Sequence, residues 1–330
     1  GKSRKVLSSN KIPPTRRRRT IREGGKMAEY LRYDSPRSES LAHDFSNRSE
    51  IPIAEPIYVL SDEAAESTHD EANLLVDLAE VAAMKDEDFA RKKIWFREAC
   101  SMITEDINTK GAIEVQVRRE HLLEDSVDAV LSLSATSLRK IWYIRFVDED
   151  HLKKQHKLKQ EWFALALTEL CDPHNALFKA QSENGRSSTH INPLSEIFSS
   201  HLRYYQFMGR FLGKALFDGI KVPNTIAPYI YKLMSGCPIT KNDVQKHCDL
   251  FSQMDRVGDV GTLCMNFTIK EMVPFEGWKS IELIQNGHNI SVTNNNLSMY
   301  KQALLKYLVF GRVKTQMSEL LRGIHEVVPR

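Results

Sequence analysis

The sequence predicts an α+β fold in which α-helices predominate. Apolar residues recur at helical spacing over most of residues 70–330, and a few short stretches alternate apolar and polar residues as half-buried strands do. No strand-helix-strand pattern repeats along the chain, which excludes a dinucleotide-binding fold. With 330 residues, 42% of them hydrophobic and 27% charged, the composition is that of a globular enzyme or binding protein of about two domains.

Residues 1–70 are predicted to form a disordered tail that is basic at first and acidic later. Residues 1–26 contain ten Lys or Arg and a single acid, Glu23, whereas residues 55–88 contain eleven acids and one Lys. The basic run at residues 16–19 is typical of nuclear import signals and of nucleic-acid binding, but also of solvated tails in general. Nucleic-acid binding is therefore kept only as a third hypothesis, which salt-steep binding through the tail would support.

A helical lead-in is expected at residues 71–110. Leu74, Leu75 and Leu78 fall on one face of a first helix, and a second helix is predicted from about residue 86 to residue 103. Each helix has one apolar face, so the pair is expected to pack against the domain that follows.

The compact part is expected at residues 111–330. Residues 113–117 and 141–147 alternate apolar and polar side chains and are predicted strands, with a helix at residues 122–133 between them. Helices with an apolar face follow at residues 159–170, 201–218, 228–234 and 240–254. Local signals set their ends, since the residue before Pro173 resists the α conformation, Gly219 suits a left-handed cap and Thr240 suits an N-cap.

The carboxyl-terminal third mixes strands and helices. Strands are expected at residues 263–269 and 280–283, and Asn286-Gly287 predicts a tight turn into a further strand at residues 289–292. Two helices are expected to follow at residues 297–310 and 313–327, separated by Gly311.

The cysteines and the hydropathy of the sequence indicate the cellular compartment of the protein. The five cysteines are scattered, so they are expected to be reduced, buried thiols in the cytosol or the nucleus. Cys237, Cys248 and Cys264 lack the close pairs typical of structural zinc, and no metal is expected. No run of ~18 apolar residues predicts a membrane span, and the basic first segment lacks the apolar stretch of a signal peptide.

Residue chemistry alone reveals no active site. Gly209 and Gly213 form a GxxxG pattern inside an amphipathic helix, without the Lys-Ser/Thr ending of a phosphate-binding loop, so they predict close helix packing. Neighbouring Cys and His residues at 171–174 and 247–248 do not predict a nucleophile, because activation needs a base oriented in space.

Several segments taken together resemble the HECT family of ubiquitin ligases. They are VQVRREHLLEDS (residues 115–126), IRFVDE (144–149), QEWF (160–163), LCDPHNALF (170–178), INPLS (191–195), HLRYYQFMGRFLGKALFDG (201–219), PYIYKLMSG (228–236), NGHNISVTNNN (286–296) and LLRGIHEVVP (320–329). Their order and spacing across about 220 residues carry the resemblance. One segment departs from the family pattern, since residues 148–160 contain several Lys and no glycine where the family has a glycine-rich turn.

The resemblance implies the amino-terminal lobe of a HECT domain, which recruits a ubiquitin-conjugating enzyme, and a parent protein that transfers ubiquitin through a cysteine thioester to substrate lysines. The implied partners are the conjugating enzyme, ubiquitin and a protein substrate, with no membrane and no cofactor. In the family the nucleophile lies in a catalytic lobe beyond the last matched segment. This chain is therefore expected to be a fragment in which Cys100, Cys171, Cys237, Cys248 and Cys264 are not catalytic. The alternative is a catalytically dead docking module for the conjugating enzyme.

The family's conjugating-enzyme groove is implied to lie on a small subdomain at about residues 225–286. The residues that match groove positions are Leu250, Phe251, Met254, Leu263, Met265 and Tyr300. The competing interpretation is that all six are core residues, because apolar residues at helical and strand spacing are usually buried.

Overall fold

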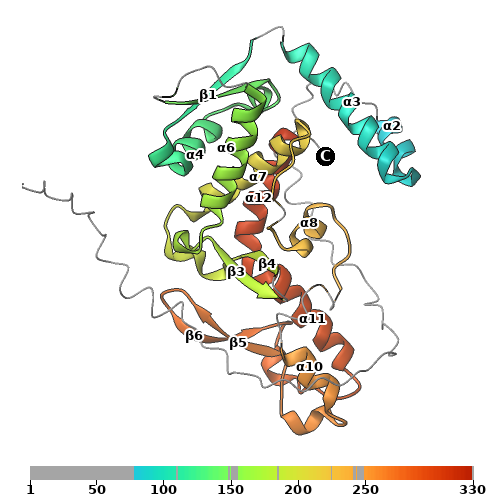
Figure 1. Ribbon diagram of the computed structural model, residues 1–330. Helices are drawn as coiled ribbons and strands as arrows, with labels where there is room; N and C mark the ends of the chain where they lie inside the picture. The colour runs from blue at the N-terminus through green and yellow to red at the C-terminus, as the bar shows by residue number, and fades with distance from the viewer. Residues whose placement is uncertain are drawn as a thin grey trace, which may run out of the picture. The chain divides into compact units, whose positions relative to one another are not determined.

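The computed structural model describes residues 78–108, 111–147, 149, 155–183, 186–223, 225–240, 243 and 249–328. The predicted tail at residues 1–70, together with Leu74 and Leu75, lies outside the described residues, and so do residues 148 and 150–154 of the glycine-free segment at 148–160. The described part is mainly helical with three two-stranded sheets, which confirms the α+β class (Figure 1).

The helices and strands follow the expected order with few exceptions. The α-helices are α2 (Leu78–Ala83), α3 (Phe89–Asn108), α4 (Leu122–Leu131), α5 (Ala135–Leu138), α6 (Gln155–Leu170), α7 (His201–Phe217), α8 (Pro228–Met234), α10 (Asp249–Arg256), α11 (Leu297–Val309) and α12 (Lys314–Val327). The strands are β1 (Ile113–Val117), β2 (Trp142–Phe146), β3 (Phe178–Glu183), β4 (Arg186–Ile191), β5 (Thr268–Val273) and β6 (Gly277–Glu282). No helix in these ranges combines the length and apolar character needed to cross a bilayer.

Helix α12 packs against α7 more extensively than any other two described elements pack together (Figure 1). A Cβ placed on Gly209 would lie 2.1 Å from the backbone O of Leu320, and one on Gly323 would lie 2.2 Å from the backbone O of Gln206. Only glycine lets the two backbones come this near. The GxxxG pattern is therefore a helix-packing device, as the sequence predicts.

Buried polar groups on α7 hold the neighbouring segments. Arg210 donates from its guanidinium to the carbonyls of Val130 (2.7 Å), Leu131 (3.1 Å) and Leu133 (3.0 Å) at the end of α4. Its Nε also pairs with Glu326 of α12. Carbonyls at the end of a helix lack partners further along it, so a cation placed there complements the helix dipole.

Lys214 makes a second polar anchor one turn further along α7. Its fully buried Nζ donates to the carbonyl of Lys140 (2.7 Å) and pairs with Asp218 (2.9 Å), which also pairs with Lys159 of α6 (2.7 Å). Burial lowers the pKa of Lys214 to about 8, and the Asp218 carboxylate opposes that shift. The two lysines and the shared carboxylate tie α6, α7 and the loop before β2 together.

A single strand-helix-strand unit begins the compact part. Strands β1 and β2 pair in parallel, with Val115 opposite Ile144, and α4 forms the connection. The indole N–H of Trp162 on α6 donates to Ser126 Oγ on α4 (2.8 Å) inside the core. Two of the segments that carry the family resemblance, LEDS and QEWF, thus meet in one buried hydrogen bond.

Two regions differ from the prediction. The β3–β4 hairpin is absent from it, because Phe178 and Ile191 are its only buried apolar residues among the described side chains, and most of its other residues are polar. The expected hairpin at Asn286-Gly287 is wrong: β6 pairs with β5 through the turn at residues 274–276, and Gly287 begins a 3-10 turn.

The strand predicted at residues 263–269 is also wrong in its first half. Residues Val260–Leu263 form a 3-10 turn, and Cys264 ends it with a left-handed φ of 47°. The strand β5 begins only at Thr268. A residue with a Cβ rarely adopts positive φ, so the residue type gave no signal for this break.

Replacing Gly209 with Ala is expected to lower the free energy of unfolding by about 3 kcal/mol, because the new methyl group would overlap the α12 backbone. Urea denaturation of the two proteins measures the difference. Gly258→Ala is the matched control, since no heavy atom lies within 4 Å of a Cβ built there. Equal midpoints for Gly209→Ala and the parent would contradict the close packing.

Candidate functional site

A small buried core supports the region in which the sequence places the groove. Phe251 and Met254 on α10 are each 1% exposed, and Phe267 just before β5 is fully buried. The Phe267 ring meets the Tyr300 ring of α11 edge to face, with centroids 5.3 Å apart and planes at 84°. Aromatic pairs favour this arrangement. These segments therefore form one packed unit.

Side-chain amides of the NISVTNNN segment fix the loops around this core. The Asn294 carbonyl accepts from the backbone N–H of Val260 (3.0 Å), and Asn296 accepts from the backbone N–H of Thr293 (2.8 Å). The amide of Asn296 also donates to the carbonyl of Ser291 (2.9 Å). Asn294 and Asn296 thus hold the turns of this segment in place.

Gly287 supports the same core through a close backbone approach. A Cβ built on it would lie 2.4 Å from the carbonyl oxygen of Phe267, whose N–H bonds to the carbonyl of Gly287 at 3.0 Å. Asn286 precedes it in the left-handed conformation, with φ of 56°. The Asn-Gly pair is needed here to bring this 3-10 turn against the segment that carries Phe267.

The β5–β6 hairpin is tied to α11 through a charged cluster. The Tyr307 hydroxyl donates to Glu271 on β5, and Arg312 lies 3.7 Å from the same carboxylate. Burial and the neighbouring Glu271 carboxylate raise the pKa of Tyr307, so its hydroxyl keeps its proton at neutral pH. These contacts attach strand β5 of the hairpin to Tyr307 on α11 and to Arg312 just after it.

The six predicted groove residues divide between interior and surface. Phe251, Met254 and Tyr300 are each 1% exposed, so in this structure they form the support of the region and not its outer face. Leu263 is 37% exposed, and Met265 is half-buried. Leu250 belongs to α10, but its side chain lies outside the described part. The groove itself stays a prediction.

Two exposed aromatic residues on the hairpin were not predicted. Phe275, at the turn, is 87% exposed, and Trp278 on β6 is 62% exposed. Phe275 also has a left-handed φ of 64°. Phe275 and Trp278 flank Glu276-Gly277, and aromatic residues on both sides of a possible turn could have indicated this hairpin. Because the turn is instead predicted at Asn286-Gly287, both residues are missed.

The cysteines differ in accessibility. Burial raises the pKa of the Cys100 thiol to about 11 and of the Cys171 thiol to about 12, so both stay protonated at neutral pH. Cys237 and Cys264 are exposed, which corrects the expectation that all the thiols are buried. Cys248 lies outside the described residues. In the part of the chain that is described, no three potential metal ligands gather at one place.

Truncating Tyr300 to Ala is expected to reduce the free energy of unfolding by about 3–5 kcal/mol, because it opens a cavity beside Phe267. Thermal unfolding and amide hydrogen exchange over residues 249–309 measure the loss. Leu263→Ala, at an exposed position, is expected to change stability by about 0.5 kcal/mol or less. A stable Tyr300→Ala protein would show that the ring contributes little to the core.

Comparison with known proteins gives consistent matches. A model of the HECT-domain (ubiquitin-transferase) family matches residues 164–330. "E3 ubiquitin-protein ligase RSP5" of Chaetomium thermophilum is 29% identical over 283 residues, covering 83% of this chain and 33% of its own length. "E3 ubiquitin-protein ligase pub3" of Schizosaccharomyces pombe is 30% identical over 276 residues, covering 82% and 34%.

A third relative, "E3 ubiquitin-protein ligase TOM1-like" of Neurospora crassa, is 30% identical over 251 residues, covering 73% of this chain and 6% of its own length. The chain thus spans about a third of the length of the first two relatives and 6% of the third. The family match covers half of the chain and falls on the segments built around α7 and α12. The chain belongs to the HECT-domain (ubiquitin-transferase) family.

Proposed function

We propose that this chain is the amino-terminal lobe of a HECT ubiquitin ligase and that it recruits a ubiquitin-conjugating enzyme. The observation that carries the proposal is the position of Leu263 and Met265. Both lie on the segment that leads into the buried Phe267, and both reach the surface while the residues beneath them are packed. An apolar contact on rigid support loses little conformational entropy when a partner binds.

The remaining predicted groove residues have a supporting role in this proposal. Phe251, Met254 and Tyr300 hold the surface in place from inside, and Leu250 is assigned to the same wall by its position on α10. The small conjugating-enzyme-binding subdomain is proposed to cover about residues 225–286, with Tyr300 contributed by α11.

The proposed activity of the whole protein is ubiquitin transfer through a thioester. A cysteine thiolate of the ligase attacks the thioester carbonyl that joins ubiquitin to the conjugating enzyme, the bond to the enzyme's sulfur breaks, and that sulfur leaves as a thiolate. A substrate lysine amine then takes ubiquitin from the ligase thioester. Cys100 and Cys171 do not suit this step because burial keeps their thiols protonated. Cys237, Cys248 and Cys264 do not match the family's nucleophile position by motif, so the nucleophile is proposed to lie outside this chain.

The partners proposed on this basis are a ubiquitin-conjugating enzyme, ubiquitin and a protein substrate, in the cytosol or the nucleus. The second candidate is a docking module that holds a conjugating enzyme without accepting ubiquitin. The two differ in one respect, which is whether the protein that contains this chain forms a ubiquitin thioester of its own.

Leu263→Asp is expected to raise the Kd for a ubiquitin-conjugating enzyme at least about tenfold, because it places a charge in an apolar contact. Isothermal titration with the purified enzyme measures the change. Leu165→Asp on α6 is the matched control, since Leu165 and Leu263 are both 37% exposed. Circular dichroism verifies that both variants are folded. Equal affinity for Leu263→Asp and Leu165→Asp would place the docking surface elsewhere.

This chain by itself is expected to form no thioester with ubiquitin. The assay mixes activating enzyme, conjugating enzyme, ubiquitin and the chain, and a non-reducing gel detects a band shifted by one ubiquitin and abolished by reductant. Cys237→Ser and Cys264→Ser are the informative variants, because these two thiols are exposed. A reductant-sensitive band that one Cys→Ser substitution removes would refute the proposal and identify the catalytic cysteine.

A further inference from the structure

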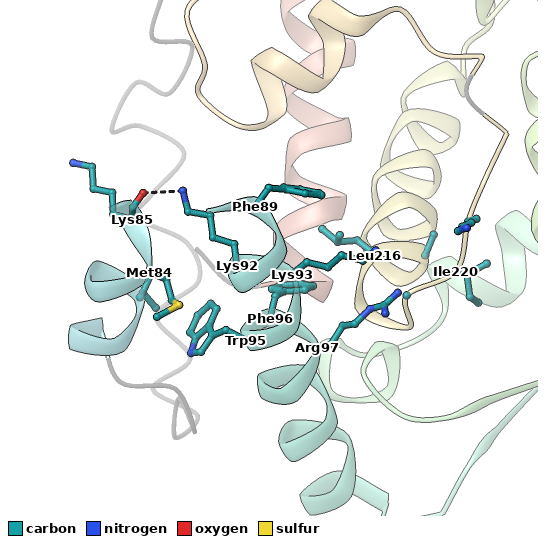
Figure 2. Close-up of a pocket in the computed structure, with 14 residues that line it drawn as sticks. Met84, Lys85, Phe89, Lys92, Lys93, Trp95, Phe96, Arg97, Leu216 and Ile220 are labelled. Atoms are coloured by element: carbon teal, nitrogen blue, oxygen red, sulfur yellow. Dashed lines mark hydrogen bonds between the residues drawn. The ribbon is translucent and has the colours of Figure 1, made fainter. Parts of the chain in front are cut away.

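A hollow of about 600 Å³ lies between α2, α3 and the end of α7, far in sequence from the proposed docking surface. We call it the α3 groove. Figure 2 shows the side chains of Phe96 and Arg97 directed from α3 toward Leu216 and Ile220, while Met84 and Trp95 lie on the side facing α2. The groove is therefore bounded by two walls that are distant in the sequence.

The walls of the α3 groove expose apolar side chains. Phe89, at the start of α3, is 80% exposed, Leu216 is 55% exposed and Val81 on α2 is 46% exposed. Further along α3, Cys100 is buried in the core. The helix is therefore packed near Cys100 and exposed at its first turn, near Phe89. Several large apolar groups converging on one hollow mark an interaction surface.

The rim of the groove is basic. Among the described residues that line it, five are Lys or Arg and none is Asp or Glu. Lys92 Nζ donates to the neutral carbonyl of Lys85 (2.8 Å) and pairs with no carboxylate among the described residues. Lys93, Arg97 and Lys221 form no ion pair with any carboxylate in the described part of the chain. An apolar floor with a positive rim fits an acidic segment that also carries apolar residues.

The chain itself contains a segment of that chemistry. Residues 55–77 include seven Asp or Glu and no Lys or Arg, and residues 57–60 read Ile-Tyr-Val-Leu. The segment leads directly into α2, which lines the groove through Val81. About 17 residues separate the apolar run from α2, and a chain of that length spans up to about 60 Å, so the run can reach the groove. Covalent attachment also raises its effective concentration there to the order of millimolar.

We propose that the α3 groove binds the chain's own acidic segment at residues 55–77. The apolar run at residues 57–60 contacts Phe89 and Leu216, and the carboxylates that follow it lie beside Lys93 and Lys221. This interaction uses none of the residues assigned to conjugating-enzyme docking and is independent of the proposed function.

Photo-crosslinking in the full chain tests the proposal. Phe89 is replaced by p-benzoylphenylalanine, a substitution that its exposed position accommodates, and the dilute protein is irradiated and digested for mass spectrometry. Crosslinks from position 89 to residues 55–77 within one chain are expected. Crosslinks only to other regions, or only between two chains in a concentration-dependent manner, would overturn the proposal.

Charge reversal sharpens the test. The double variant Lys93→Glu with Lys221→Glu is expected to reduce the crosslink yield about tenfold, and high salt is expected to have the same effect. The control variant Lys270→Glu with Lys306→Glu carries its changes at exposed positions away from the groove and is expected to leave the yield unchanged. Adding Asp62→Lys and Glu63→Lys to the first pair is expected to restore the yield. An unchanged yield in Lys93→Glu with Lys221→Glu would overturn the role of the basic rim.

Discussion

The contact between α7 and α12 is the constraint on which the rest of the described structure depends. Gly209 and Gly323 let the two backbones approach closely, and that proximity aligns Arg210 with both Glu326 and the carbonyls at the end of α4. A turn further on, Lys214 holds the loop before β2. The strand-helix-strand unit, α6 and α12 are therefore all positioned by one helix, and each of its inward polar groups serves a different neighbour.

In the candidate docking region too, a few buried contacts fix the position of the surrounding segments. Its buried aromatic pair, Phe267 and Tyr300, joins β5 to α11, and the cluster around Glu271 holds the hairpin to the same helix. Only after this support is in place do Leu263 and Met265 have a defined position at the surface. Under the proposed function, a short apolar contact on firm support would give modest affinity and therefore fast dissociation of the conjugating enzyme.

Much of the fold was predictable from the sequence, since long helices such as α7 and α12 carry a strong apolar period. The hairpins were less predictable: β3–β4 buries little beyond Phe178 and Ile191, and the break at Cys264 depends on a backbone conformation that its residue type does not announce. The family resemblance predicts the docking region as a segment, but it could not divide the predicted residues into buried and exposed ones. Whether Tyr300 lies beneath or upon that region depends on tertiary packing.

The pairing of α7 with α12 also has a consequence for the order of folding. The two glycines in contact are separated by roughly a hundred residues, so the loop they close carries a substantial entropic cost before any contact is gained. During synthesis the apolar side of α7 leaves the ribosome long before its partner helix exists. Until α12 emerges, that apolar surface is exposed, so it can associate with the wrong partners and can be bound by chaperones. The feature that makes the finished core compact thus makes the unfinished chain vulnerable.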